Sequence, residues 1–147
     1  MTTTQNQPDQ SGGNRKTDQL TEHDLAHFTG DLVRIRHGLN RQVIYTPGVR
    51  HVVEKGQACW LIDAIASWIG SNPFNEAVTN DPRIGDLHFW TFEKQEDQPS
   101  ILYAKADSPE EPFISQLIEH TDFPLDRIDI WAAFDGMYWT LYLPSEH

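Results

Sequence analysis

The single cysteine of this 147-residue chain is the residue with the most evident nucleophilic chemistry. Cys59 stands at the start of an apolar segment with helical spacing, and a helix N-terminus lowers the pKa of a thiol. A histidine would then act as the general base, and the candidates are His88 and His120. Asp126 or Asp129 would orient that histidine. These residues define one enzymatic hypothesis, a cysteine-dependent hydrolase.

A packing role competes with catalysis at this cysteine. The Cys59-Trp60 pair, two residues after Gln57, superficially resembles the active-site helix of papain-like cysteine peptidases. No local signature of such a family surrounds the pair, and a lone cysteine in an apolar helix is usually a small core residue. We therefore favour a core position for Cys59 and keep the hydrolase as the alternative.

Histidine is the next residue type to weigh, because the chain contains seven. His23 and His27 are four residues apart, but two ligands do not close a zinc site. No pair has the spacing of a zincin helix or a zinc knuckle. The sequence therefore predicts no metal site and no cofactor.

The charge of the chain is unevenly distributed. The formal net charge is −11, and residues 61–147 hold sixteen Asp or Glu against four Lys or Arg, whereas residues 1–60 sum to +1. A field of this sign repels nucleic-acid backbones and membrane surfaces and attracts basic proteins. It also leaves open a further alternative, an acidic protein that mimics nucleic acid.

One basic stretch precedes the acidic half. Arginines interleaved with an aromatic residue are typical of nucleic-acid surfaces, since Arg binds phosphate in a bidentate manner. The overall field instead favours pairing of these side chains with the acidic half of the same molecule, so we expect no nucleic-acid binding. The stretch consists of Arg34, Arg36, His37, Arg41, Arg50 and His51, with Tyr45 among them.

The element that must position this chemistry is a buried helix over residues 57–69. Its apolar residues recur at helical spacing around most of the circumference, and Asp63 and Ser67 mark the polar edge. Such a helix is buried on more than one side. The apolar members are Ala58, Leu61, Ile62, Ala64, Ile65, Trp68 and Ile69.

The segments downstream predict a mostly antiparallel sheet. Residues 87–94 and 100–106 have the pattern of a hairpin, and residues 43–46 that of a short strand. Residues 108–120 are ambiguous, because they begin with a helix-start signature. Pro112 at the fourth helical position opposes a helix, and a strand over residues 113–119 would extend the meander, so we favour the strand.

The C-terminal segment predicts a hairpin with a partly aromatic second face. Asp135-Gly136 indicates a two-residue type I′ turn, which places Ala132 opposite Trp139 on an apolar face. The other face would anchor a protein interface if no helix covers it. Its candidate binding residues are Trp131, Tyr138, Tyr142 and Asp129.

The remaining segments predict the domain organisation. Residues 1–20 have the composition of a disordered tail, and residues 21–147 form a single α+β domain. Pro47-Gly48 suits a type II turn, and residues 71–86 read as a long loop. No apolar run approaches the roughly 20 residues of a membrane span. The N-terminus has no signal-peptide layout and the cysteine is alone, so we expect the cytoplasm.

Several short segments carry a family resemblance. They are Leu39-Asn40-Arg41, Tyr45-Thr46, Gly48-Val49, Glu54-Lys55-Gly56, Trp60-Leu61-Ile62-Asp63, Thr121-Asp122-Phe123-Pro124-Leu125 and Leu143-Pro144-Ser145. Across residues 26–146 the chain resembles an uncharacterised bacterial family of small proteins, a domain of unknown function often found on plasmids or other mobile elements. The resemblance implies no activity. It implies an aromatic residue more often than cysteine at position 59, and it favours a strand within 108–120.

Together these observations predict an α+β fold in which N-terminal helices, one of them long and buried near 57–69, pack on a four- or five-stranded, mostly antiparallel sheet. We expect a non-enzymatic interaction or regulatory protein whose partner is another protein or a second copy of the chain. The hydrolase using Cys59 and the acidic mimic remain alternatives.

Overall fold

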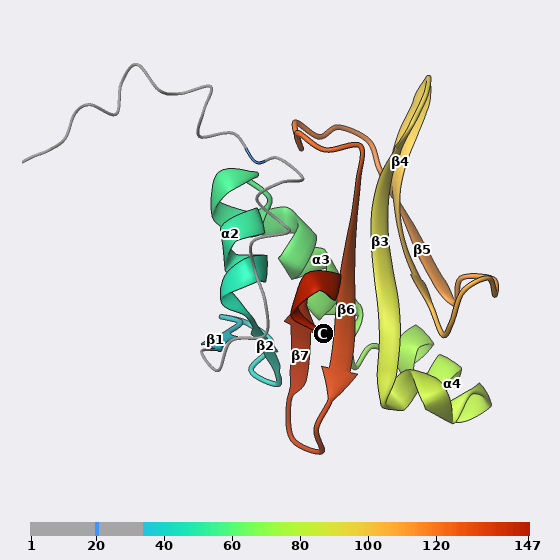
Figure 1. Ribbon diagram of the computed structural model, residues 1–147. Helices are drawn as coiled ribbons and strands as arrows, with labels where there is room; N and C mark the ends of the chain where they lie inside the picture. The colour runs from blue at the N-terminus through green and yellow to red at the C-terminus, as the bar shows by residue number, and fades with distance from the viewer. Residues whose placement is uncertain (1–19, 21–33) are drawn as a thin grey trace, which may run out of the picture.

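A computed structural model describes Leu20 and residues 34–147 (Figure 1). Apart from Leu20, whose side chain is buried, the predicted tail over residues 1–20 lies outside the described residues. The predicted short helix with His23 and His27 also lies outside them.

The described residues form a sheet of seven strands and three α-helices. The strands are β1 (Ile35–Arg36), β2 (Val43–Tyr45), β3 (Leu87–Gln95), β4 (Gln98–Lys105), β5 (Ile114–Ile118), β6 (Arg127–Phe134) and β7 (Trp139–Tyr142). The helices are α2 (Pro47–Lys55), α3 (Cys59–Trp68) and α4 (Asn72–Asn80), with two 3-10 turns, η4 (Pro82–Gly85) and η5 (Pro144–Glu146). Figure 1 shows α2 on the side of β1 and β2, and α4 on the side of β3, β4 and β5.

The sheet has the order β1-β2-β7-β6-β3-β4-β5. All neighbouring strands pair antiparallel except β2 and β7, which pair parallel. The predicted α+β class is confirmed, but four or five strands was too few and the sheet is mixed. The two residues of β1 are too few to show a period-two pattern, and the β2–β7 pairing is a long-range contact that no local pattern encodes. Residues 114–118 form a strand, as favoured.

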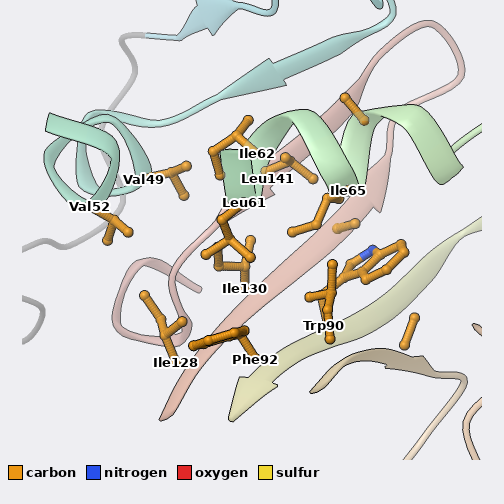
Figure 2. Close-up of a cluster of buried hydrophobic side chains, with 14 of the residues drawn as sticks. Val49, Val52, Leu61, Ile62, Ile65, Trp90, Phe92, Ile128, Ile130 and Leu141 are labelled. Carbon is orange, nitrogen blue, oxygen red and sulfur yellow. The ribbon is translucent and has the colours of Figure 1, made fainter. Parts of the chain in front are cut away.

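Helix α3 covers the inner face of this sheet. Leu61 and Ile65 are fully buried, and Figure 2 shows them directed toward Ile130 and Trp90 of the central strands. The predicted buried helix is therefore confirmed. The polar edge is confirmed as well, since Asp63 is exposed.

Helix α2 begins at Pro47, so the predicted type II turn at Pro47-Gly48 is wrong. Thr46 has an extended backbone, and its Oγ1 accepts a hydrogen bond from the Val49 N–H at 3.2 Å. This is an N-cap, and proline directly after a cap is favourable because its missing N–H has no intrahelical partner to lose.

A carboxylate from the end of the chain completes this cap. Glu146 is 8% exposed, and its Oε1 accepts hydrogen bonds from Thr46 Oγ1 at 2.6 Å and from the Leu143 N–H at 2.8 Å. Its Oε2 accepts one from the Gly48 N–H at 3.3 Å, and a Cβ at Gly48 would lie 2.8 Å from the carboxylate. A larger residue at position 48 would therefore displace the Glu146 carboxylate from this position. A negative charge here also complements the positive end of the α2 dipole.

Residues 71–86 form α4 and η4, so the predicted long loop is wrong. Ser71 Oγ accepts a hydrogen bond from the Phe74 N–H at 3.4 Å and caps α4, and Asp81 caps η4 in the same way. Phe74 is the one buried residue of α4, so the apolar periodicity was too sparse to indicate a helix.

The β6–β7 hairpin differs from its predicted register by two residues. Ala132 lies opposite Leu141 rather than Trp139. The Asp135 carboxylate accepts hydrogen bonds from the N–H groups two and three residues further on, which places Asp135 before the turn instead of inside it. Gly136, with φ +99°, takes the first central position, as in a type II′ turn. Because the slip is two residues, every strand side chain keeps its predicted face.

Removal of core volume beneath α3 tests this packing. We expect Ile65→Ala to lower the free energy of unfolding by about 3 kcal/mol, since it removes buried methyl groups and leaves a cavity. Chemical denaturation measures the change. The matched control on the same helix is Cys59→Ala, which changes an exposed residue and should leave the midpoint unaltered. Equal midpoints for both variants would contradict the packing.

The cap by Glu146 gives a second stability test. We expect Glu146→Gln to lower the free energy of unfolding by about 2 kcal/mol, because a buried charged acceptor of three hydrogen bonds is lost. Glu96→Gln is the control, since Glu96 is exposed in the β3–β4 turn. A wild-type denaturation curve for Glu146→Gln would show that the carboxylate does not stabilise α2.

Candidate interaction face

The second face of the sheet carries the candidate site. In β3 the inward side chains of Trp90 and Phe92 are at most 1% exposed, whereas the outward side chains of Phe89 and Glu93 are only partly buried. His147, which directly follows η5, contacts Trp131 on this outer side, with ring centroids 5.2 Å apart. We call this surface the open face. Its residues are Phe89, Thr91, Glu93, Ile101, Tyr103, Lys105, Ser115, Leu117, Arg127, Asp129, Trp131 and Tyr142.

An aromatic row crosses the open face from β3 to β7. The strand register places Phe89 opposite Trp131, and Trp131 opposite Tyr142. The ring centroids of Phe89 and Trp131 are 5.1 Å apart, and those of Trp131 and Tyr142 are 6.0 Å apart, both edge to face. Tyr142 and His147 share a hydrogen bond of 2.9 Å between the hydroxyl and Nδ1. The row is thus held in place before any partner binds.

A polar network lies beside the aromatic row. Arg127 Nη2 and Thr91 Oγ1 both donate hydrogen bonds to Asp129 Oδ1, at 3.2 and 2.8 Å. The Tyr103 hydroxyl donates to Glu93 Oε1 at 2.9 Å. Burial, and then the hydrogen bond to Glu93, raise the pKa of Tyr103, so this phenol stays protonated as a donor. The hydrogen bond to Asp129 likewise raises the pKa of Arg127.

Between these two rows the open face is hollowed by a depression of about 370 Å³. Its lining combines aromatic rings with charged and hydroxyl-bearing side chains. Its lining contains no cysteine or histidine, so none of the three residues of the catalytic alternative belongs to it. The lining consists of Phe89, Thr91, Tyr103, Lys105, Asp107, Ser108, Arg127, Asp129 and Trp131.

Three of the four predicted binding residues meet here. Asp129 and Trp131 line the hollow, and Tyr142 contacts Trp131 beside it. Tyr138 lies instead in the β6–β7 turn, where its hydroxyl accepts a hydrogen bond from Arg36 Nη2 at 2.9 Å. Sequence reasoning missed the contributions of β3 and β4, although the period-two pattern of those strands could have assigned Phe89 to this face.

The three candidates for the catalytic alternative are not brought together. Cys59 is exposed, so the predicted core position is wrong; it occupies the first position of α3, before the buried stripe begins at Leu61. Burial and then the nearby Cys59 raise the pKa of Tyr45 on β2. His88 is fully buried on β3, and its ring contacts are with Phe74, Trp90, Phe113 and Trp139. His120 is exposed after β5, the opposite edge of the sheet.

His88 is a core residue with a neutral ring. It is fully buried between aromatic rings, with centroids 4.9 Å from Trp139 and 5.3 Å from Phe74. Its Nδ1 is 3.1 Å from the Ile84 carbonyl oxygen, to which it donates. Burial lowers the pKa of His88 to about 4.

The basic stretch is used largely within the molecule. His37 Nε2 donates to Asp63 Oδ1 at 2.8 Å, which fits the predicted pairing with the acidic half. Arg36 contacts Tyr138, and Arg50 pairs with Glu54 at 2.9 Å on its own helix. The guanidinium group of Arg36 thus contacts the β6–β7 turn, and that of Arg50 forms an ion pair within α2.

Two kinds of feature are absent from the described residues. In residues 34–147 and Leu20, no three His, Cys, Asp or Glu side chains are grouped so as to hold a metal ion. Within the same part of the chain, no helix has both the length and the apolar character to cross a bilayer.

Comparison with known proteins gives the family. A family model, described as a family of unknown function (DUF6876), matches residues 19–147. The chain belongs to this family. The predicted resemblance to an uncharacterised family is thus confirmed, and DUF6876 has no established function to transfer. No curated protein matches the chain. A crystal structure of a protein of unknown function from Enterococcus faecalis is 20% identical, with a TM-score of 0.48, covering 80% of this chain and 93% of that one.

The buried histidine gives a pH-dependent prediction. His88 binds fewer protons folded than unfolded between pH 6.5 and about 4, so the free energy of unfolding falls as the pH falls through this window. The loss due to His88 is about 3 kcal/mol. We expect His88→Phe to remove this part of the pH dependence in denaturation curves. His120→Gln, an exposed control, should retain it. Parallel curves for wild type and His88→Phe would contradict the buried neutral ring.

Proposed function

We propose that this DUF6876 protein is a non-enzymatic protein-interaction protein whose partner docks on the open face. The observation that carries the proposal is the combination of partly exposed aromatic rings with a preformed hollow on the sheet face opposite the one that α3 covers. Trp131 and Phe89 at the centre of this surface are residue types that anchor protein interfaces.

The rigidity of the surface supports recognition. Trp131 is in edge-to-face contact with Phe89 on one side and with Tyr142 on the other. Asp129 is fixed by two donors, Thr91 from the neighbouring strand β3 and Arg127 from its own strand. A partner that binds here loses little free energy to the ordering of these side chains, which favours affinity.

Charge supports a basic partner. The charged side chains in the hollow balance, since Lys105 and Arg127 offset Asp107 and Asp129. Beyond the hollow, however, residues 61–147 carry a net charge of −12, from sixteen acidic and four basic residues. A positively charged protein would be steered to this part of the molecule at low salt. We propose the cytoplasm as the place of this encounter.

Site-specific crosslinking tests the proposal. The photoreactive residue p-benzoylphenylalanine in place of Phe89 should yield one main crosslinked protein in the native host, of basic composition. Adding Trp131→Ala should reduce this product about tenfold, as expected for an interface anchor. Leu39→Ala is the control, because Leu39 is 90% exposed but lies in the β1–β2 turn.

The outcomes separate the alternatives. Loss of the product with Trp131→Ala but not with Leu39→Ala supports docking on the open face. A product twice the mass of the chain would show that the partner is a second copy of the chain and not a basic protein. Crosslinks that are absent, or that are insensitive to Trp131→Ala, would contradict the proposal.

A further inference from the structure

Strand β5 forms one edge of the sheet, and no described strand pairs with its outer side. Its five residues, Ile114–Ile118, carry no charge, and Leu117 is 58% exposed. Edge strands in soluble proteins are usually protected by charged residues, proline or a covering segment, because their free N–H and C=O groups pair readily with another strand. The opposite edge, β1, is two residues long and includes Arg36. Of the two edge strands, β5 is therefore the better suited to pair with a further strand.

Carboxylates stand at both ends of this uncharged strand. Glu111 precedes it, and Glu119 and Asp122 follow it, all of them exposed. An extended segment laid along β5 would therefore have negative charge near each of its ends. Lys or Arg at those two positions would be attracted, and Asp or Glu repelled.

We propose that β5 binds an extended segment of a partner protein by strand addition, with apolar residues at its centre and Lys or Arg at both ends. This inference deepens the proposed function, on which it rests for the class of partner. A second copy fits less well, because an antiparallel β5–β5 pair would bring Glu119 of each copy toward the Glu111 end of the other, where like charges repel.

Contacts with neighbouring elements hold β5 in place before any partner binds. Trp68 Nε1 donates to Gln116 Oε1 at 2.8 Å, which ties the middle of β5 to the last turn of α3. In the open face, Leu117 lies opposite Ile101 of β4. An added strand would place alternate side chains beside Leu117 and so extend the open face outward.

Amide chemical shifts of the isotope-labelled full chain test the proposal. The probe is a peptide of alternating Val and Thr with two Lys at each end. It should shift the amides of Ser115 and Leu117 in a saturable manner. The same peptide with Glu ends, or with N-methyl groups on alternate amides, should bind at least about tenfold more weakly, because charge attraction or backbone hydrogen bonds are lost. Leu117→Lys should weaken the Lys peptide by a similar factor, whereas Trp131→Ala should not.

Other outcomes overturn the proposal in distinguishable ways. Slow amide exchange at Ser115 and Leu117 in the free monomer would show that another part of this chain already covers the edge. The same protection in a dimer would show that a second copy does. Absence of shifts at β5 with every peptide would remove strand addition. Binding that responds to Trp131→Ala and not to Leu117→Lys would place the peptide in the hollow, so that strand addition fails while docking on the open face stands.

Discussion

Helix α3 packs Leu61 and Ile65 onto the side chains of the central strands, and this contact decides which face of the sheet is inside (Figure 2). Side chains alternate along a strand, so a buried Trp90 commits Phe89 to the opposite face. The pairings of β3 with β6 and of β6 with β7 carry the same choice across to Trp131 and Tyr142. The aromatic row of the open face is therefore a consequence of the core beneath it.

Polar contacts hold α3 and its neighbours in this position. Asn40 Nδ2 donates to the carbonyl oxygens of Ala66 and Ile69, at 2.9 and 3.3 Å, at the C-terminal end of α3. His37, bonded to Asp63, also accepts the Asn40 N–H at its Nδ1, so the β1–β2 turn is fixed to the helix. Glu146 performs a similar task for α2. Short, weakly patterned segments are thus secured by side-chain hydrogen bonds rather than by long strands.

Elements with many apolar residues at regular spacing were predicted correctly from the sequence, and elements with few such residues were not. The α3 segment was predictable because most of its circumference is apolar, whereas α4 buries one residue and was read as a loop. In the last hairpin, the capping preference of Asp135 outweighed the dipeptide turn signal. Trp131 and Asp129 were found from one hairpin. Their partners on β3 and β4 were not, because Thr91 meets Asp129 across 38 residues of sequence.

The open face joins the fold to the proposed function, since Phe89 and Trp131, which the core excludes, stay partly exposed to a partner, whereas Thr91 and Tyr142 on the same face are themselves buried. Oxidative footprinting of the full chain by hydroxyl radicals measures this division directly. Trp131 should be oxidised several times faster than Trp90 and Trp139, whose exposed fractions are 0% and 6%. Protection of Trp131 equal to that of Trp90 would show that the face is covered, and would contradict its role as a docking surface.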